Sequence, residues 1–118
     1  PAYRMVTPVT LLHARLDPHA ALKLPAAAMA FAYGLKGTAA SGAADLGPQV
    51  LLTYDAAGEV ATFAAGAAGA EFMFGTGTPI GEPLVYGGPF VMTTAAQMTE
   101  TKRRYARGEM GVLPPLRA

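Results

Sequence analysis

The segment 81–94 limits the fold most strongly, because an apolar stretch with Gly and Pro on both sides leads directly into a capped helix. Thr94 precedes Gln97 by three positions, the spacing of a capping box, in which both side chains satisfy orphan amides at a helix start. Gly108 stands where a left-handed residue commonly ends a helix. The segment therefore predicts a short strand, a sharp change of direction and a helix over about 95–107.

The second half of this helix is strongly basic, with Lys102, Arg103, Arg104 and Arg107 close together. Cations at this end complement the helix dipole, and Glu100, four residues before Arg104, adds a weakly stabilising pair. A contact with nucleic acid or with an acidic partner is the alternative. The formal net charge of the chain is only +1. A solvated helix face is therefore favoured, and no nucleic-acid partner is expected.

The rest of the chain has the alternation of strands. Fourteen Gly and ten Pro favour many short strands joined by tight turns. Strands are predicted over 6–16, 20–24, 29–37, 50–54, 59–65 and 70–75, with turns or loops at 17–19, 41–48, 55–58 and 66–69. The strands 50–54 and 59–65 are expected to form a hairpin. Seven or eight strands in 118 residues predict one all-β domain, a β-sandwich or barrel, with one C-terminal helix and a tail over 112–118.

Bulky apolar side chains are few in this alanine-rich sequence, and two interpretations of them stay open. They are Met29, Phe31, Tyr33, Phe63, Phe72 and Phe74. These side chains could line a small-molecule cavity at a barrel mouth. The other interpretation, favoured because little else is available to fill a core, is that they are the core itself.

No catalytic residue is predicted. The carboxylates are scattered singly, and Glu71, between apolar neighbours, is expected to face solvent on a half-exposed strand rather than to act as a general base. Ser41 is the only serine and has no nucleophile elbow around it. The glycine-rich stretch 75–79 lacks the Lys and helix start of a phosphate loop. The absence of cysteine excludes thiolate chemistry and disulfides.

His13 and His19 are the only histidines and therefore weak candidates for metal ligands. Their separation spans a predicted bend, so the two rings could approach each other. A mononuclear site needs about three imidazoles and a carboxylate, and no carboxylate is expected beside this pair. One strand histidine and one turn histidine without a metal are the favoured interpretation.

The order of strand, G-P-F-V-M and closing helix resembles the C-terminal domain of pirin family proteins, which reads G-E-P, a short strand, G-P-F-V-M-N-T, a helix and A-G-x-x-G. The residues that carry this resemblance are Gly81, Glu82, Pro83, Gly88, Pro89, Phe90, Thr94 and Gly108. Looser matches upstream are Thr7-Pro8, Leu24-Pro25 and the segment 31–37. Lys102 departs from the pattern, because apolar residues usually occupy this helix position in the family.

The resemblance implies a cupin-type, jelly-roll-like β-sandwich with one C-terminal helix. Pirin-like proteins have two cupin domains, and the metal-binding His and Glu residues lie in the N-terminal one. Iron or another divalent metal is therefore expected only where that domain is present. The family also implies quercetin dioxygenase activity in the metal-bearing protein and, alternatively, a role as a transcriptional co-regulator that works through protein partners.

The function expected for this chain is that of a metal-free half of a bicupin, acting in domain packing, dimerisation or protein interaction. Its partner is expected to be a second copy in a homodimer or a sister cupin domain, because a lone cupin half exposes the surface that its sister would cover. A role as part of a quercetin 2,3-dioxygenase is the alternative. A cytoplasmic location is expected, since no segment has a secretory or membrane-spanning pattern.

Overall fold

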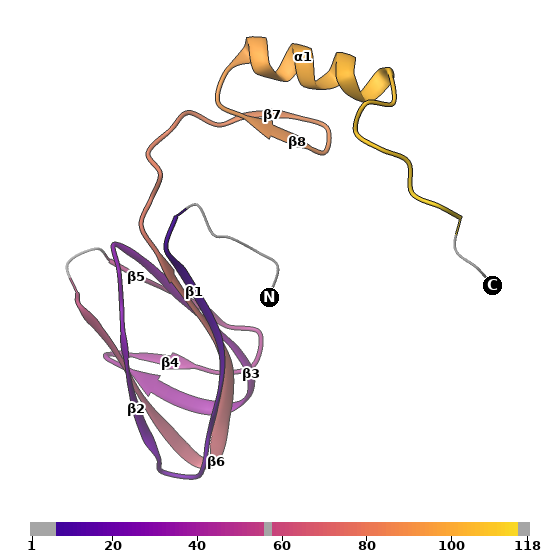
Figure 1. Ribbon diagram of the computed structural model, residues 1–118. Helices are drawn as coiled ribbons and strands as arrows, with labels where there is room; N and C mark the ends of the chain where they lie inside the picture. The colour runs from indigo at the N-terminus through magenta and orange to yellow at the C-terminus, as the bar shows by residue number, and fades with distance from the viewer. Residues whose placement is uncertain (1–6, 56–57, 116–118) are drawn as a thin grey trace. The chain divides into compact units, whose positions relative to one another are not determined.

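The structure is a computed structural model that describes residues 7–55 and 58–115. These residues form eight strands and one helix in two compact units, Pro1–Ile80 and Gly81–Ala118 (Figure 1). The prediction that the whole chain is one cupin domain stays a prediction.

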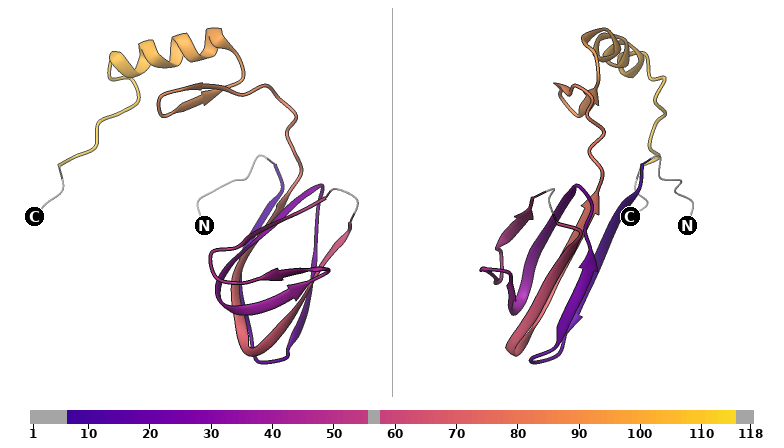
Figure 2. Two further views of the ribbon diagram at one scale, coloured as in Figure 1. Left: turned by 180° about the vertical axis from the view of Figure 1, so that it is seen from behind. Right: turned by 90° about the vertical axis from the view of Figure 1, so that its left-hand side faces the viewer.

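The first unit consists of six antiparallel strands. They are β1 (Val9–Leu16), β2 (Ala21–Pro25), β3 (Met29–Ser41), β4 (Ala44–Leu46), β5 (Leu51–Tyr54) and β6 (Val60–Gly77). The longest strand, β6, pairs with β1, β2 and β3, while β3 also pairs with β4 and β5. Two long strands therefore connect all the others, and in both views of Figure 2 the other strands gather around them.

Strand β6 changes neighbours at its middle. Its first part pairs with β2 and with the end of β3, and its second part pairs with β1 and with the start of β3. Strand β3 bends beside it, with register shifts between Gly34 and Lys36 and between Gly37 and Ala39. Each long strand thus contributes to both layers of a β-sandwich, which confirms the predicted fold class.

Two glycines permit this bend. Gly37 and Gly69 have φ angles of 63° and 73°, which glycine adopts without strain. A Cβ on Gly37 would collide with the carbonyl oxygen of Gly69, so the two backbones touch at the bend. The turn predicted at 66–69 is therefore wrong: the chain continues as one strand, and the glycines allow a bend rather than a reversal.

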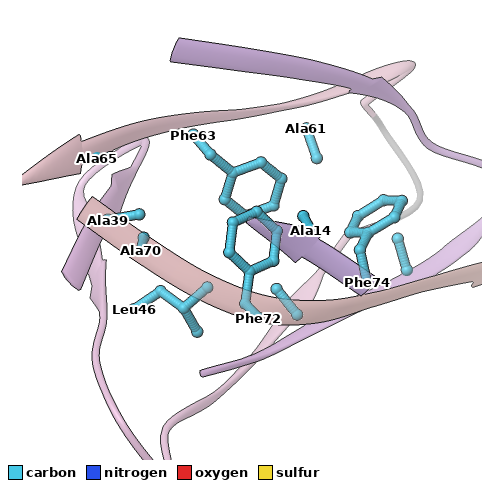
Figure 3. Close-up of a cluster of buried hydrophobic side chains, with 11 residues drawn as sticks. Ala14, Ala39, Leu46, Ala61, Phe63, Ala65, Ala70, Phe72 and Phe74 are labelled. Atoms are coloured by element: carbon cyan, nitrogen blue, oxygen red, sulfur yellow. The ribbon is translucent and has the colours of Figure 1, made fainter. Parts of the chain in front are cut away.

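The core lies between the layers and is built on three phenylalanines of β6 (Figure 3). Phe63, Phe72 and Phe74 are each at most 1% exposed. The ring centroids of Phe63 and Phe72 are 4.4 Å apart, and Phe74 meets Phe63 edge-on at 5.9 Å. Alanines such as Ala30 and Ala32 face these rings from β3, because the rings leave little space for larger side chains.

The structure corrects two further predictions in this unit. Strand β5 pairs with β3, so the expected hairpin of 50–54 with 59–65 does not form. Strand β3 continues past Gly37 to Ser41, and Ala44–Leu46 returns beside it as β4, so the predicted loop 41–48 contains part of a hairpin. Hydrogen bonding to the extended end of β3 overrides the loop-like composition of this segment. Part of the connection predicted at 55–58, Ala56 and Ala57, lies outside the described residues.

The second unit contains β7 (Val85–Gly87), β8 (Phe90–Met92) and α1 (Ala95–Ala106). The two strands form a hairpin around Gly88-Pro89, where the single predicted strand is wrong. Gly88 has a φ of 66°, and the ring of Pro89 fixes a negative φ. Positive φ followed by negative φ is the pattern of a type II′ turn, whose twist suits a two-residue hairpin loop.

Both predicted ends of the helix are confirmed. Thr94 and Gln97 form the capping box. At the other end Gly108, with φ 72°, donates its amide to the carbonyl of Tyr105 (3.0 Å), and the amide of Glu109 donates to the carbonyl of Arg104 (3.0 Å). This pair of bonds is the Schellman arrangement. Of the predicted tail, residues 112–115 have no regular structure and 116–118 lie outside the described residues.

The charges on α1 are largely paired with one another, as a solvated face requires. Glu100 contacts Arg103 and Arg107, and Arg104 contacts Glu109, so the predicted pair of Glu100 with Arg104 is wrong. The face of α1 toward the hairpin carries the buried Met98. Its sulfur and the aliphatic end of Lys102 lie over Gly87, where a Cβ would collide with the Met98 sulfur. The methylene stem of Lys102 thus takes the place of an apolar residue.

Phe63→Ala is expected to lower the free energy of unfolding of the first unit by about 3–5 kcal/mol, because it opens a cavity between the two layers. Urea unfolding followed by circular dichroism measures this loss. Phe31→Ala removes the same side chain from a site that is 37% exposed and serves as the control, with an expected loss of about 1 kcal/mol. Equal losses for the two variants would contradict this description of the core.

Candidate functional site

The surface of the first unit that offers a binding site is one face of the sheet β1–β6–β3–β5. Directly paired residues on antiparallel strands share a face, and one set of pairs points away from the core. This outer face comprises Val9, Leu11, His13, Arg15, Met29, Phe31, Tyr33, Lys36, Leu51, Thr53, Glu71, Met73, Gly75 and Gly77. The opposite face, which includes Leu12, Ala14 and Phe72, packs in the core.

One end of the outer face is an apolar groove of about 580 Å³. Its walls include Val9, Leu11, Met29, Phe31 and Leu51. Leu11 is 64% exposed and Met29 58% exposed, so these side chains stand in solvent within this unit.

The floor of the groove depends on glycine. The ring of Phe31 lies over Gly75, where a Cβ would collide with the ring. Gly75 and Gly77 pair with both β1 and β3 at this end. The central strand therefore contributes backbone instead of side chains here, which gives the Phe31 ring room to lie against it and line the groove.

The other end of the outer face is charged. Glu71 pairs with Arg15 on one side and with Lys36 on the other. His13 Nε2 donates a hydrogen bond to Oε1 of Glu71 (3.0 Å). Glu71 does face outward as expected, but its carboxylate is hydrogen-bonded to the neighbouring His13. The sequence could have shown this neighbour only through the strand register.

The six predicted cavity residues divide between the two faces. Phe63, Phe72 and Phe74 lie together in the core, while Met29 and Phe31 line the groove. Tyr33 lies on the outer face, opposite Met73. Three of the six therefore belong to the core, while the small-molecule cavity at a barrel mouth stays a prediction, because the groove lies on the outer face of the sheet. The sequence missed Val9, Leu11 and Leu51 as groove residues, because alternation shows that a strand has two faces but not which face is covered.

The residues present do not fit the metal site of a cupin. His13 contacts one carboxylate, and His19 lies exposed in the turn before β2 with a φ of 61°. Over residues 7–55 and 58–115, no three His, Asp or Glu side chains gather closely enough to hold a metal ion. The expectation concerned a carboxylate that joins both histidines, and Glu71 bonds to one of them, His13. One imidazole and one carboxylate still fall short of the set that a mononuclear site requires.

Ser41 has a structural partner, which sequence reasoning did not find. Its buried hydroxyl lies 2.8 Å from the hydroxyl of Tyr54. Burial raises the pKa of Tyr54 above its ordinary value, and the hydrogen bond with Ser41 partly opposes this rise. The pair satisfies two polar groups beside the phenylalanine cluster, which the ring of Tyr54 meets edge-on.

The residues of the family motif have structural positions. Gly81, Glu82 and Pro83 precede β7. Gly88 and Pro89 form the hairpin turn, Phe90 begins β8, and Thr94 and Gly108 lie at the two ends of the helix.

A two-layered sandwich that two long strands share, followed by a hairpin and a helix, defines a cupin-type domain. The sequence matches the Pirin C-terminal cupin domain family over residues 11–111. Because this match covers most of the chain, the protein belongs to that family.

Solved structures share this fold. A crystal structure of quercetin 2,3-dioxygenase from Acinetobacter baumannii matches with a TM-score of 0.81 and 23% identity, over 93% of this chain and 39% of that one. A second structure of quercetin 2,3-dioxygenase from the same organism matches with a TM-score of 0.69 and 15% identity, over 99% of this chain and 42% of that one. The chain thus spans about two fifths of these proteins.

No curated protein matches the sequence. Among the described residues, no helix has the length and apolar character to cross a membrane.

The stability of the first unit is expected to fall as pH rises above 10.0, the ordinary value for tyrosine. Because the pKa of Tyr54 is raised in the folded state, the unfolded chain releases the hydroxyl proton at a lower pH than the folded chain does. The contribution of Tyr54 to the free energy of unfolding is therefore complete below the ordinary tyrosine value and is lost as pH rises through the folded pKa. Urea unfolding at several alkaline pH values, compared with Tyr54→Phe, measures the effect. The Tyr54→Phe variant is expected to lose less free energy of unfolding as pH rises. If the plots of this free energy against pH are parallel for the two proteins, Tyr54 is not the source of the alkaline loss.

Proposed function

We propose that this chain is a docking module without a metal site of its own, which packs its outer face against a second cupin domain. The observation that carries the proposal is the distribution of apolar side chains in the first unit. Phenylalanine and alanine fill the core, while Val9, Leu11, Met29 and Leu51 stand exposed around the groove.

The energetics support docking on this face. Contiguous exposed apolar surface marks interaction sites in soluble proteins. Covering such side chains is favourable by about 25 cal/mol per Å² of apolar area, so a few fully covered aliphatic side chains contribute several kcal/mol. The outer face is also built on the sheet rather than on loops, so little backbone ordering opposes association.

A second cupin domain is the partner that the comparisons support. The similar quercetin dioxygenase chains are more than twice as long as the part that this chain matches. A second copy of this chain presents the same sheet face and can form a two-fold symmetric, self-complementary contact. We therefore expect a homodimer for the isolated chain.

Sedimentation velocity at low micromolar concentration is expected to show a dimer of the 118-residue chain. Leu11→Glu is expected to shift the protein to monomer, because an unpaired carboxylate would be buried in the contact. Val60→Glu is the matched control, because Val60 is also exposed but pairs with Pro25 in the other layer. This control is expected to remain dimeric.

A monomeric wild-type chain would contradict the proposed self-association. A Leu11→Glu variant that remains dimeric would place the contact elsewhere than the outer face. Circular dichroism of both variants shows whether the fold persists, so that a loss of association is not confused with unfolding.

A second candidate function is to serve as the C-terminal part of a quercetin 2,3-dioxygenase. It is supported by the two solved structures of that activity, which share the fold at TM-scores of 0.81 and 0.69. Because the described residues bring no three metal ligands together, the contribution of this chain would be to support a metal-bearing domain.

Elemental analysis of the purified chain after dialysis against a weak chelator is expected to find metal far below one equivalent, because His13 and Glu71 provide only two ligands. Metal near one equivalent per chain that is lost in His13→Ala would contradict both candidates as stated. His19→Ala is the matched control, since this ring lies in the turn before β2.

A further inference from the structure

The two ends of the outer face differ in chemistry, and this difference specifies a partner. The groove end presents Leu11, Phe31 and Leu51. The charged end presents Arg15 and Lys36 on the two sides of Glu71. Both ends lie on the same side of the same strands, so one extended partner segment can contact both.

The charged end carries an excess of positive charge. Glu71 already accepts the hydrogen bond from His13. In the part of the chain that the structure describes, neither Arg15 nor Lys36 has a carboxylate within 4.0 Å. Two cations face a single engaged carboxylate, so the local charge favours a further anionic group.

There is also space for such a group. A small pocket of about 160 Å³ lies at this end, lined by Arg15, Lys36, Glu71 and the backbone near Gly37 and Gly69. A carboxylate fits in this volume, since one water molecule occupies about 30 Å³. The planar guanidinium of Arg15 can bind both oxygens of a carboxylate at once.

The spacing of the two ends matches the repeat of an extended chain. Leu11 and Arg15 are four residues apart on β1, which corresponds to about 14 Å at the rise of a strand. Side chains on one face of a bound strand recur at every second position. When an acidic side chain at position five reaches Arg15 and Lys36, an apolar side chain at position one therefore reaches the groove beside Leu11. One at position three then lies over Tyr33 and Met73.

We infer that the outer face receives an extended partner segment in which two alternate apolar residues are followed, two positions later, by an acidic residue. The first apolar side chain occupies the groove, the second lies over Tyr33 and Met73, and the carboxylate lies between Arg15 and Lys36. This assignment rests on the proposed docking function and names the chemistry that the covering domain presents.

The test uses two blocked pentapeptides as probes. One has leucine at positions one and three, threonine at positions two and four, and glutamate at position five; the other has glutamine at position five. Their dissociation constants are measured by nuclear magnetic resonance titration of the wild-type chain at low ionic strength, and sedimentation with and without peptide shows whether the peptide competes with self-association. The titration also maps which amides shift.

The glutamate peptide is expected to bind about threefold more tightly than the glutamine peptide, the size of an exposed ion pair. Amide shifts are expected along β1 from Leu11 to Arg15. In the double variant Arg15→Gln and Lys36→Gln the preference is expected to disappear. Lys23→Gln, an exposed cation on β2 in the other layer, is the matched control and is expected to retain the preference.

Equal affinities for the two peptides, or binding of neither, would overturn the inference. A preference that survives the double variant would also overturn it. These results are independent of the sedimentation experiment. A monomeric wild-type chain that still discriminates the peptides contradicts self-association alone, while a dimer that does not discriminate them contradicts only the acidic position.

Discussion

The contact between the two halves of β6 is the interaction on which the first unit depends. Phe63 lies in one layer and Phe72 in the other, and their rings meet at 4.4 Å because the strand bends between them. The bend in turn depends on Gly37 and Gly69, whose backbones approach too closely for any side chain on Gly37. A single strand thereby joins the layers and provides the three fully buried aromatic rings that separate them.

The composition of the core differs from strand to strand. Strand β3 faces the rings of β6 with alanines, whereas β1, β2 and β5 contribute partly buried leucines. Larger side chains of β1 and β3, such as Leu11 and Met29, occupy the alternate positions and point outward. Their exposure gives the first unit an apolar surface suited to a partner.

Local sequence signals predicted the second unit well. The capping box of Thr94 and Gln97 and the left-handed Gly108 depend on residues a few positions apart, so their energetics do not involve distant parts of the chain. The strand alternation of β1 and of the second half of β6 was also correct, because side-chain polarity reports the face of a strand. The segment that contains the hairpin at Gly88-Pro89 predicts a single strand, although its turn residues do predict a change of direction.

Sequence by itself determined the position of the helix and the centres of most strands, and the motif residues from Gly81 to Gly108 indicated the pirin family, because propensity, capping and turn chemistry act over short distances. Tertiary structure alone decided that β5 pairs with β3 and that β6 bends without reversing. It also decided that Phe31 faces solvent while Phe72 is buried. These outcomes depend on which strands meet across long separations, and the periodicity of a strand is the same whichever of its faces is covered.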